Sequence, residues 1–221
     1  MKHGRGAPHS AMIYSHMLSF LLQGLVLGLS AGFAPGPLLT LVISESLRHG
    51  GRAGIRVSLA PIVTDAPIIA VTLLLLSRLS HFEPLLGTLS LLGGLFVLYL
   101  GWENIATKGV AMTPGRSSPR SLHKGVLVNF LSPHPYIFWL TVGGPITWRA
   151  LEKGPLHAAL FVGSFYALLI GSKVALAVAA DRSRSFLTGP VYIAVMRLLG
   201  LALCLLAMLL VRDGLHRLGL M

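Results

Sequence analysis

The chain alternates between long apolar runs and short polar connections. Six runs have the length, about 20 residues, at which an α-helix crosses the hydrocarbon core of a bilayer. They are Leu18–Ile43, Val57–Leu76, Leu85–Trp102, Gly125–Trp148, Leu156–Ala180 and Val191–Val211. This pattern predicts an all-α, polytopic membrane protein with six transmembrane helices.

The longest connection divides the six runs into two groups of three. It extends from Thr107 to Lys124 and is polar and rich in glycine, serine and proline. We therefore predict one membrane domain over residues 1–221, with one repeat at about 18–104, a linker at 107–124 and a second repeat at about 125–212. Because three is an odd number of spans, the two repeats would be inverted relative to one another.

Two proline pairs interrupt apolar runs, one in each half of the chain. They are Pro35-Gly36-Pro37 in the first run and Pro133-His134-Pro135 in the fourth. Each proline lacks a backbone donor and clashes with the carbonyl four residues earlier, so neither run can be a continuous helix. In lipid, such breaks persist only where protein or a water-filled cavity satisfies the freed backbone groups. Matched breaks in two halves point to the binding site of a transporter.

Composition agrees with a membrane location. Only 11% of the 221 residues are charged and 54% are hydrophobic, whereas soluble domains have about 25% charged residues. The net charge of +11 does not indicate nucleic-acid binding, because the basic residues lie in short connections and form no stripe with interleaved aromatic residues. Basic connections of this kind orient membrane proteins against anionic headgroups.

Three charged residues lie inside the predicted spans. Asp65 is eight residues into the second span, Lys173 seven from the end of the fifth, and Arg197 six into the sixth. All three of these span ends lie on one side, so a rise of 1.5 Å per residue places the charges in one layer roughly 10 Å deep. Charges at this depth usually pair or line a pathway.

Less specific interpretations of these residues remain open. Asp65 with Lys173 or Arg197 could be a buried pair that only fixes helix register. Lys173 could extend to the interface. His134, between two prolines, could bind a metal ion or a proton, although a lone histidine is more often a hydrogen-bonded packing residue. Gly24 and Gly28 form a G-x-x-x-G pattern that favours packing within the chain over dimerisation, with a homodimer left open.

Several stretches resemble the LysE-type translocators, the family of lysine and homoserine/threonine exporters. Gly32-Phe33-Ala34-Pro35-Gly36-Pro37 resembles their first-span signature, and Gly50-Gly51-Arg52-Ala53-Gly54 is similar to the turn before their second span. Asp65 matches the acidic position of that span. Tyr99-Leu100-Gly101-Trp102 is similar to the end of the third span, and Asn129-Phe130-Leu131-Ser132-Pro133 to the opening of the fourth.

The resemblance implies a multi-pass exporter of the bacterial inner membrane, driven by the proton or ion gradient and not an enzyme. The expected solute is an amino acid or a related small metabolite, moved by alternating access. The expected partners are the solute, a coupling ion and the bilayer. We predict no cofactor, no catalytic residue and no metal site. The expected substrate- or ion-binding residues are Pro35, Gly36, Pro37, Asp65, Asn129, Pro133, His134, Pro135, Lys173 and Arg197.

Two alternatives to an amino-acid exporter stay open. One is a divalent metal exporter, suggested by nine histidines, although they are scattered and form no metal-binding cluster. The other is a membrane assembly factor without transport activity. A thiol-transferring membrane oxidoreductase is excluded, because that mechanism needs two reactive cysteines and Cys204 is the single cysteine of the chain.

Overall fold

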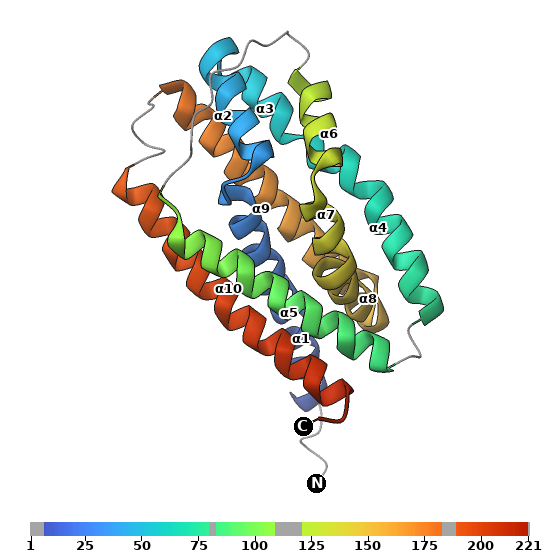
Figure 1. The fold of residues 1–221 in the computed structure, drawn as a ribbon. Helices are drawn as coiled ribbons and strands as arrows, with labels where there is room; N and C mark the ends of the chain where they lie inside the picture. Colours follow the sequence, from blue (N-terminus) through green and yellow to red (C-terminus); the bar gives the residue numbers. More distant parts are fainter. Residues whose placement is uncertain (1–6, 80–82, 109–120, 183–188, 221) are drawn as a thin grey trace.

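The structure is a computed structural model that describes residues 7–79, 83–108, 121–182 and 189–220. Within these ranges it is entirely helical and contains no strand. Figure 1 shows an elongated bundle in which the described ends of the chain lie at the same end. The helices are α1 (Ala7–Phe33), α2 (Pro37–His49), α3 (Gly51–Ser58), α4 (Ala60–Leu79), α5 (Glu83–Ala106), α6 (Ser121–Leu131), α7 (Pro133–Phe138), the π-helix η1 (Trp139–Gly143), α8 (Gly144–Lys153), α9 (Pro155–Arg182) and α10 (Pro190–Arg217).

Five helical segments among the described residues are long and apolar enough to cross a membrane. They are Tyr14–Phe33, Gly51–Arg78, Gly87–Ala106, Pro155–Arg182 and Ile193–Arg217. The predicted run Gly125–Trp148 is divided among α6, α7, η1 and α8, so no single helix there reaches the required length. The predicted linker at 107–124 lies largely outside the described residues, and α6 begins inside it at Ser121.

The chain leaves helical conformation at both proline pairs. α1 ends at Phe33 and α2 begins at Pro37, with Gly36 between them fully extended at φ −175° and ψ 176°. α6 ends at Leu131, and Ser132 is extended at φ −77° and ψ 133° before α7 begins. A residue that precedes proline is displaced from the helical region, and proline is well suited to the first position of the next helix.

The long helices pack closely through glycines. A Cβ atom at Gly24 or Gly28 of α1 would overlap the backbone carbonyls of Phe161 or Phe165 in α9. Gly101 of α5 is in similar contact with α10. Small residues allow such close approach of helices in lipid, so the G-x-x-x-G pattern is used for packing within the chain.

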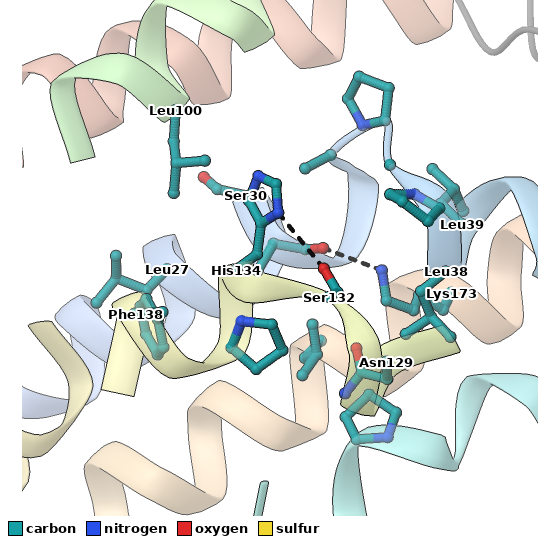
Figure 2. Close-up of a pocket in the computed structure, with 18 of the residues that line it drawn as sticks. Leu27, Ser30, Leu38, Leu39, Leu100, Asn129, Ser132, His134, Phe138 and Lys173 are labelled. Atoms are coloured by element: carbon teal, nitrogen blue, oxygen red, sulfur yellow. Dashed lines mark hydrogen bonds between the residues drawn. The ribbon is translucent and has the colours of Figure 1, made fainter. Parts of the chain in front are cut away.

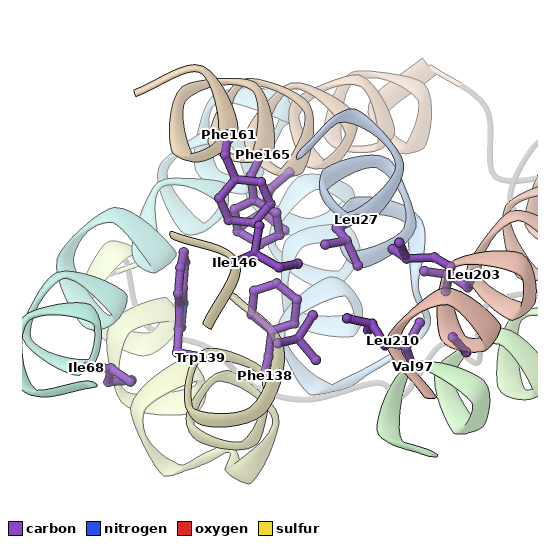
Figure 3. Close-up of a cluster of buried hydrophobic side chains, with 14 residues drawn as sticks. Leu27, Ile68, Val97, Phe138, Trp139, Ile146, Phe161, Phe165, Leu203 and Leu210 are labelled. Carbon is purple, nitrogen blue, oxygen red and sulfur yellow. The ribbon is translucent and has the colours of Figure 1, made fainter. Parts of the chain in front are cut away.

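Two hydrophobic clusters hold the bundle together. Figure 3 shows the larger one, where Trp139 and Phe138 lie near Phe165 of α9, while Leu203 and Leu210 of α10 lie on the side of the cluster away from Trp139. Phe138 and Phe165 stack with ring centroids 5.0 Å apart. The second cluster joins α2, α3 and α9 and includes Met196 of α10. Large apolar side chains also cover the outer surface, including Leu74 of α4 and Leu198 of α10, as expected of helices that contact lipid.

Candidate functional site

A pocket lies where the two helix breaks meet. Its cavity volume is about 150 Å³, and its walls come from α1, α2, α4, α5, α6, α7, η1, α9 and α10. Figure 2 shows Asn129, His134 and Lys173 around it. Eight of the ten predicted site residues line this pocket: Pro35, Gly36, Pro37, Asp65, Asn129, His134, Pro135 and Lys173.

Asp65 is held by a cage of neutral donors. The residue is only 4% exposed. Oδ1 accepts hydrogen bonds from Asn129 Nδ2 at 3.2 Å and from Thr64 Oγ1 at 3.1 Å. Oδ2 accepts from Trp139 Nε1 and from the hydroxyl of Tyr166, each at 3.2 Å. Thr64 has a single hydroxyl proton and its Oγ1 also lies 3.1 Å from the Ala60 carbonyl oxygen, so Asn129, Trp139 and Tyr166 are the full-time donors to this carboxylate.

The local fold positions these donors. Trp139 is the first residue of η1, directly after α7, and its ring stacks on that of Tyr166 in α9 with centroids 6.1 Å apart. Thr64 also accepts a hydrogen bond of 2.6 Å from Asn129 Nδ2, which ties α4 to α6. Sequence reasoning identified Asp65 and Asn129 but missed Thr64, Trp139 and Tyr166. The signal was available, because the indole N–H and the phenol of residues inside apolar spans need partners.

Lys173 caps the broken end of α1. Its ammonium donates to the carbonyl oxygens of Ala31 at 3.0 Å and Gly32 at 3.1 Å, and the residue is 4% exposed. These carbonyls belong to the last turn of a helix, where no following N–H is available to them. Among the described residues, no ion pair joins Lys173 to Asp65. The predicted alternative of a simple buried pair is therefore not what the structure contains.

His134 and Arg197 lie in different surroundings from those of Asp65 and Lys173. His134 lines the pocket but is exposed, with Nδ1 3.5 Å from Ser132 Oγ and its ring 6.3 Å from that of Phe96. Arg197 is exposed on α10 and outside the pocket lining, as is Pro133 at the start of α7. The structure therefore does not bring Arg197 together with Asp65 and Lys173. No cluster of three metal-binding side chains occurs within the described part of the chain.

Sequence reasoning also missed two polar networks at the ends of the bundle. Near the α2 end, Glu45 is fully buried and accepts hydrogen bonds from Ser121 at 2.6 Å and Lys124 at 2.9 Å. At the opposite end, Asp213 of α10 accepts from three groups on α5, α8 and α10 itself. These are Ser90 at 2.9 Å, Arg149 at 2.8 Å and Arg217 at 3.2 Å. Both networks join helices from different halves of the chain (Figure 1).

Comparison with known families agrees with the resemblance noted from the motifs. The LysE type translocator family matches residues 29–214, which is most of the chain. The chain belongs to the LysE type translocator family. The match includes both helix breaks, Asp65 and Lys173, so all of the pocket lining except Leu27 lies within the family region of this translocator. No curated protein and no solved structure matches the chain.

Family membership and the apolar helices together identify a multi-pass membrane protein of a transporter class. The members of this class are translocators and not enzymes. For this LysE type translocator, the pocket at the two breaks is the candidate place where a solute is bound.

Proposed function

We propose that this protein is a secondary transporter that exports amino acids or related small metabolites across the bacterial inner membrane. Export is coupled to the proton or ion gradient by alternating access. The observation that carries the proposal is the pocket, in which two helix breaks, a buried carboxylate and a buried ammonium meet within the membrane-spanning bundle. Ionisable groups at this depth are rare and usually belong to a substrate or ion pathway.

The packing of the helices supports two inverted repeats. α1, in the first span, packs along α9, which is the fifth span. α4, in the second span, packs on α6 and α8, which belong to the fourth. The broken span of each half therefore contacts the middle span of the other half. α5 and α10, which are the last spans of the two halves, pack on each other. Exchanging the halves leaves this set of contacts unchanged, as a two-fold axis in the membrane plane would require.

The connections after the broken spans are also alike. α2 is joined to α3 through Gly50 at φ 82°, and α8 is joined to α9 through Gly154 at φ 134°. Both conformations lie in the region that glycine adopts readily and other residues do not. Each half would then consist of one broken span, one tight glycine turn and two further spans.

Asp65 and Lys173 have distinct roles in this proposal. Asp65 lines the pocket and is the group that carries the coupling proton or binds the cationic group of the solute. Lys173 holds the open end of α1 in place and leaves one N–H bond for an acceptor, since an ammonium has three donors and two are used within the described residues. Rocking of one half against the other would expose this pocket to each side in turn.

Efflux from loaded vesicles tests the proposal. The purified chain is reconstituted, and release of amino acids, dipeptides and divalent metal ions is measured with and without an imposed proton gradient. We expect gradient-dependent release of at least one amino acid and none of the metal ions. Release of metal ions alone would establish the metal exporter instead. Absence of release of every solute would contradict a transport function.

A further inference from the structure

Two buried polar groups of residues that line the pocket have no hydrogen-bond partner within the described ranges of the chain. Ser30 is 3% exposed and Asn104 is 1% exposed. Neither Ser30 Oγ nor Asn104 Nδ2 has a hydrogen-bond partner among the described residues. A buried polar group without a partner costs about 1–3 kcal/mol, and most such groups in proteins are satisfied. Of the three unpartnered side-chain atoms in the described part of the chain, these two line the pocket.

The two groups belong to one end of the pocket. Figure 2 shows Ser30 on the same side as Leu100, away from Lys173 and Asn129. Leu100, Glu103 and Asn104 are three and four residues apart on α5, so they share one helix face, and all three line the pocket. Glu103 is half-buried there. This end therefore offers two donors and one carboxylate.

Apolar side chains also line the pocket. Leu27, Phe138 and Leu203 are at most 8% exposed, and Figure 2 shows Leu27 and Phe138 on the side of the pocket away from Lys173 and Asn129. Both oxygens of Asp65 already accept hydrogen bonds from neutral donors of the protein, so a solute is not needed to satisfy this carboxylate. A cavity of about 150 Å³ is comparable to an engineered apolar cavity of that size that binds benzene. This is the volume of the whole pocket, so a solute with one compact apolar side chain, of the size of isobutyl or phenyl, is the largest that suits it.

We propose that Ser30, Glu103 and Asn104 form a head-group subsite for an α-amino acid with an apolar side chain such as leucine or phenylalanine. Ser30 and Asn104 donate to the carboxylate, Glu103 accepts from the ammonium group, and the side chain lies against Leu27 and Phe138. The charge of a long cationic side chain would lie among apolar walls, which is unfavourable, or would meet Asp65 only in place of the donors that already hold that carboxylate. This inference rests on the proposed function, because it names the solute class of the same pocket.

The test compares head groups and side chains in reconstituted vesicles of the full chain. Phenylalanine, leucine, lysine and glycine are assayed as solutes, with 3-phenylpropionate and phenethylamine as competitors that each lack one charged group. We expect export of phenylalanine and leucine at least tenfold faster than that of lysine or glycine. Each competitor should bind about tenfold more weakly than phenylalanine, since one hydrogen-bonded group corresponds to about a factor of ten.

Substitutions separate a binding role from a structural one. Ser30→Ala and Asn104→Ala should each raise the KM for phenylalanine about tenfold. Ser30→Ala should leave the melting temperature of the solute-free protein unchanged or higher, because it removes a buried group without a partner. Glu103→Gln should weaken the binding of phenylalanine and leave the binding of 3-phenylpropionate, which has no ammonium group, unchanged. Ser77→Ala, on the exposed face of α4, is the matched control and should change neither quantity.

Two results would overturn the inference while export of an amino acid stands. One is preferential export of lysine or glycine. The other is an unchanged KM for phenylalanine in both Ser30→Ala and Asn104→Ala, which would mean that water alone satisfies these groups. If Asn104→Ala does not fold, the KM of Ser30→Ala, which removes only a hydroxyl group, decides whether these groups bind the solute. If no amino acid were exported, that result would instead contradict the proposed transport function itself.

Discussion

At the scale of single residues, Asp65 and Lys173 occupy the same pocket in different ways. Asp65 is surrounded by four neutral donors from α4, α6, η1 and α9, whereas the ammonium of Lys173 donates hydrogen bonds to the backbone of α1. A carboxylate in a neutral cage can change its protonation without breaking an ion pair. An ammonium on two carbonyls instead acts as a permanent cap of a helix end.

Replacing Asp65 by asparagine should stop coupled export. Asp65→Asn keeps the size of the side chain but removes the titratable group and turns an amide N–H toward donors. We expect efflux at least tenfold slower, with unfolding of the protein in detergent as a control for stability. Asp181→Asn, at the exposed end of α9, should export at the normal rate. Normal export by Asp65→Asn would show that the carboxylate is not the coupling group.

Removing the ammonium of Lys173 should destabilise the protein. Lys173→Met leaves the Ala31 and Gly32 carbonyls buried without a donor, and each such group costs about 1–3 kcal/mol. For a chain of this size, 1 kcal/mol corresponds to a change in melting temperature of about 2–4 °C. We expect a decrease of about 5 °C in detergent, partly restored in Lys173→Arg. An unchanged melting temperature would contradict the capping role.

Counting residues along a span predicts the depth of a residue but not the direction in which its side chain points. Asp65 and Lys173 are both buried at the pocket, in agreement with one polar layer. Arg197 has the same predicted depth, yet its neighbour Met196 is fully buried and Arg197 itself is exposed. Successive helical residues differ by about 100° in direction, and only tertiary packing decides which one faces the core. The sequence also could not predict that Ser30 and Asn104 are buried without a hydrogen-bond partner among the described residues, because this too depends on tertiary packing.

At the scale of elements, local chemistry predicts the breaks but not everything around them. The ends of α1 and α6 follow from proline geometry alone. The π-helical turn at Trp139–Gly143 contains no proline, but Pro145 of α8 follows it and has no N–H for the carbonyl of Thr141 four residues earlier. This proline predicts an irregular turn without specifying its form, and close packing of the Thr141 carbonyl on Gly93 of α5 is not readable from the sequence.

Close packing of α1 on α9 should be sensitive to a single added carbon atom. Gly28→Ala places a Cβ against the backbone of Phe165, and overpacking of this kind costs about 1–3 kcal/mol. We expect a lower melting temperature. Gly163→Ala on α9 has open space around the new Cβ and should be neutral or slightly stabilising, because alanine favours helix by about 1 kcal/mol relative to glycine. Equal effects of the two substitutions would argue against this packing.

At the scale of the whole molecule, the pocket lies between two polar networks. Glu45 joins α2 to α6 at one end of the bundle, and Asp213 joins α10 to α5 and α8 at the other. In the proposed alternating access, the two halves would separate at one network while the other stays closed. Membership of the LysE type translocator family supports transport. The solute, the coupling ion and the two-fold repeat remain proposals that rest on the pocket and the packing.

The central claim is that the solute passes through the pocket at the two helix breaks. It is tested most directly by placing one cysteine at His134, which lines the pocket and is exposed, in a chain that also carries Cys204→Ala. The account predicts that a small hydrophilic thiol reagent modifies His134→Cys, that modification blocks efflux, and that excess transported solute protects the cysteine. Arg197→Cys, outside the pocket lining, should keep its efflux after the same treatment. Complete modification of His134→Cys with undiminished efflux and no protection would contradict the claim.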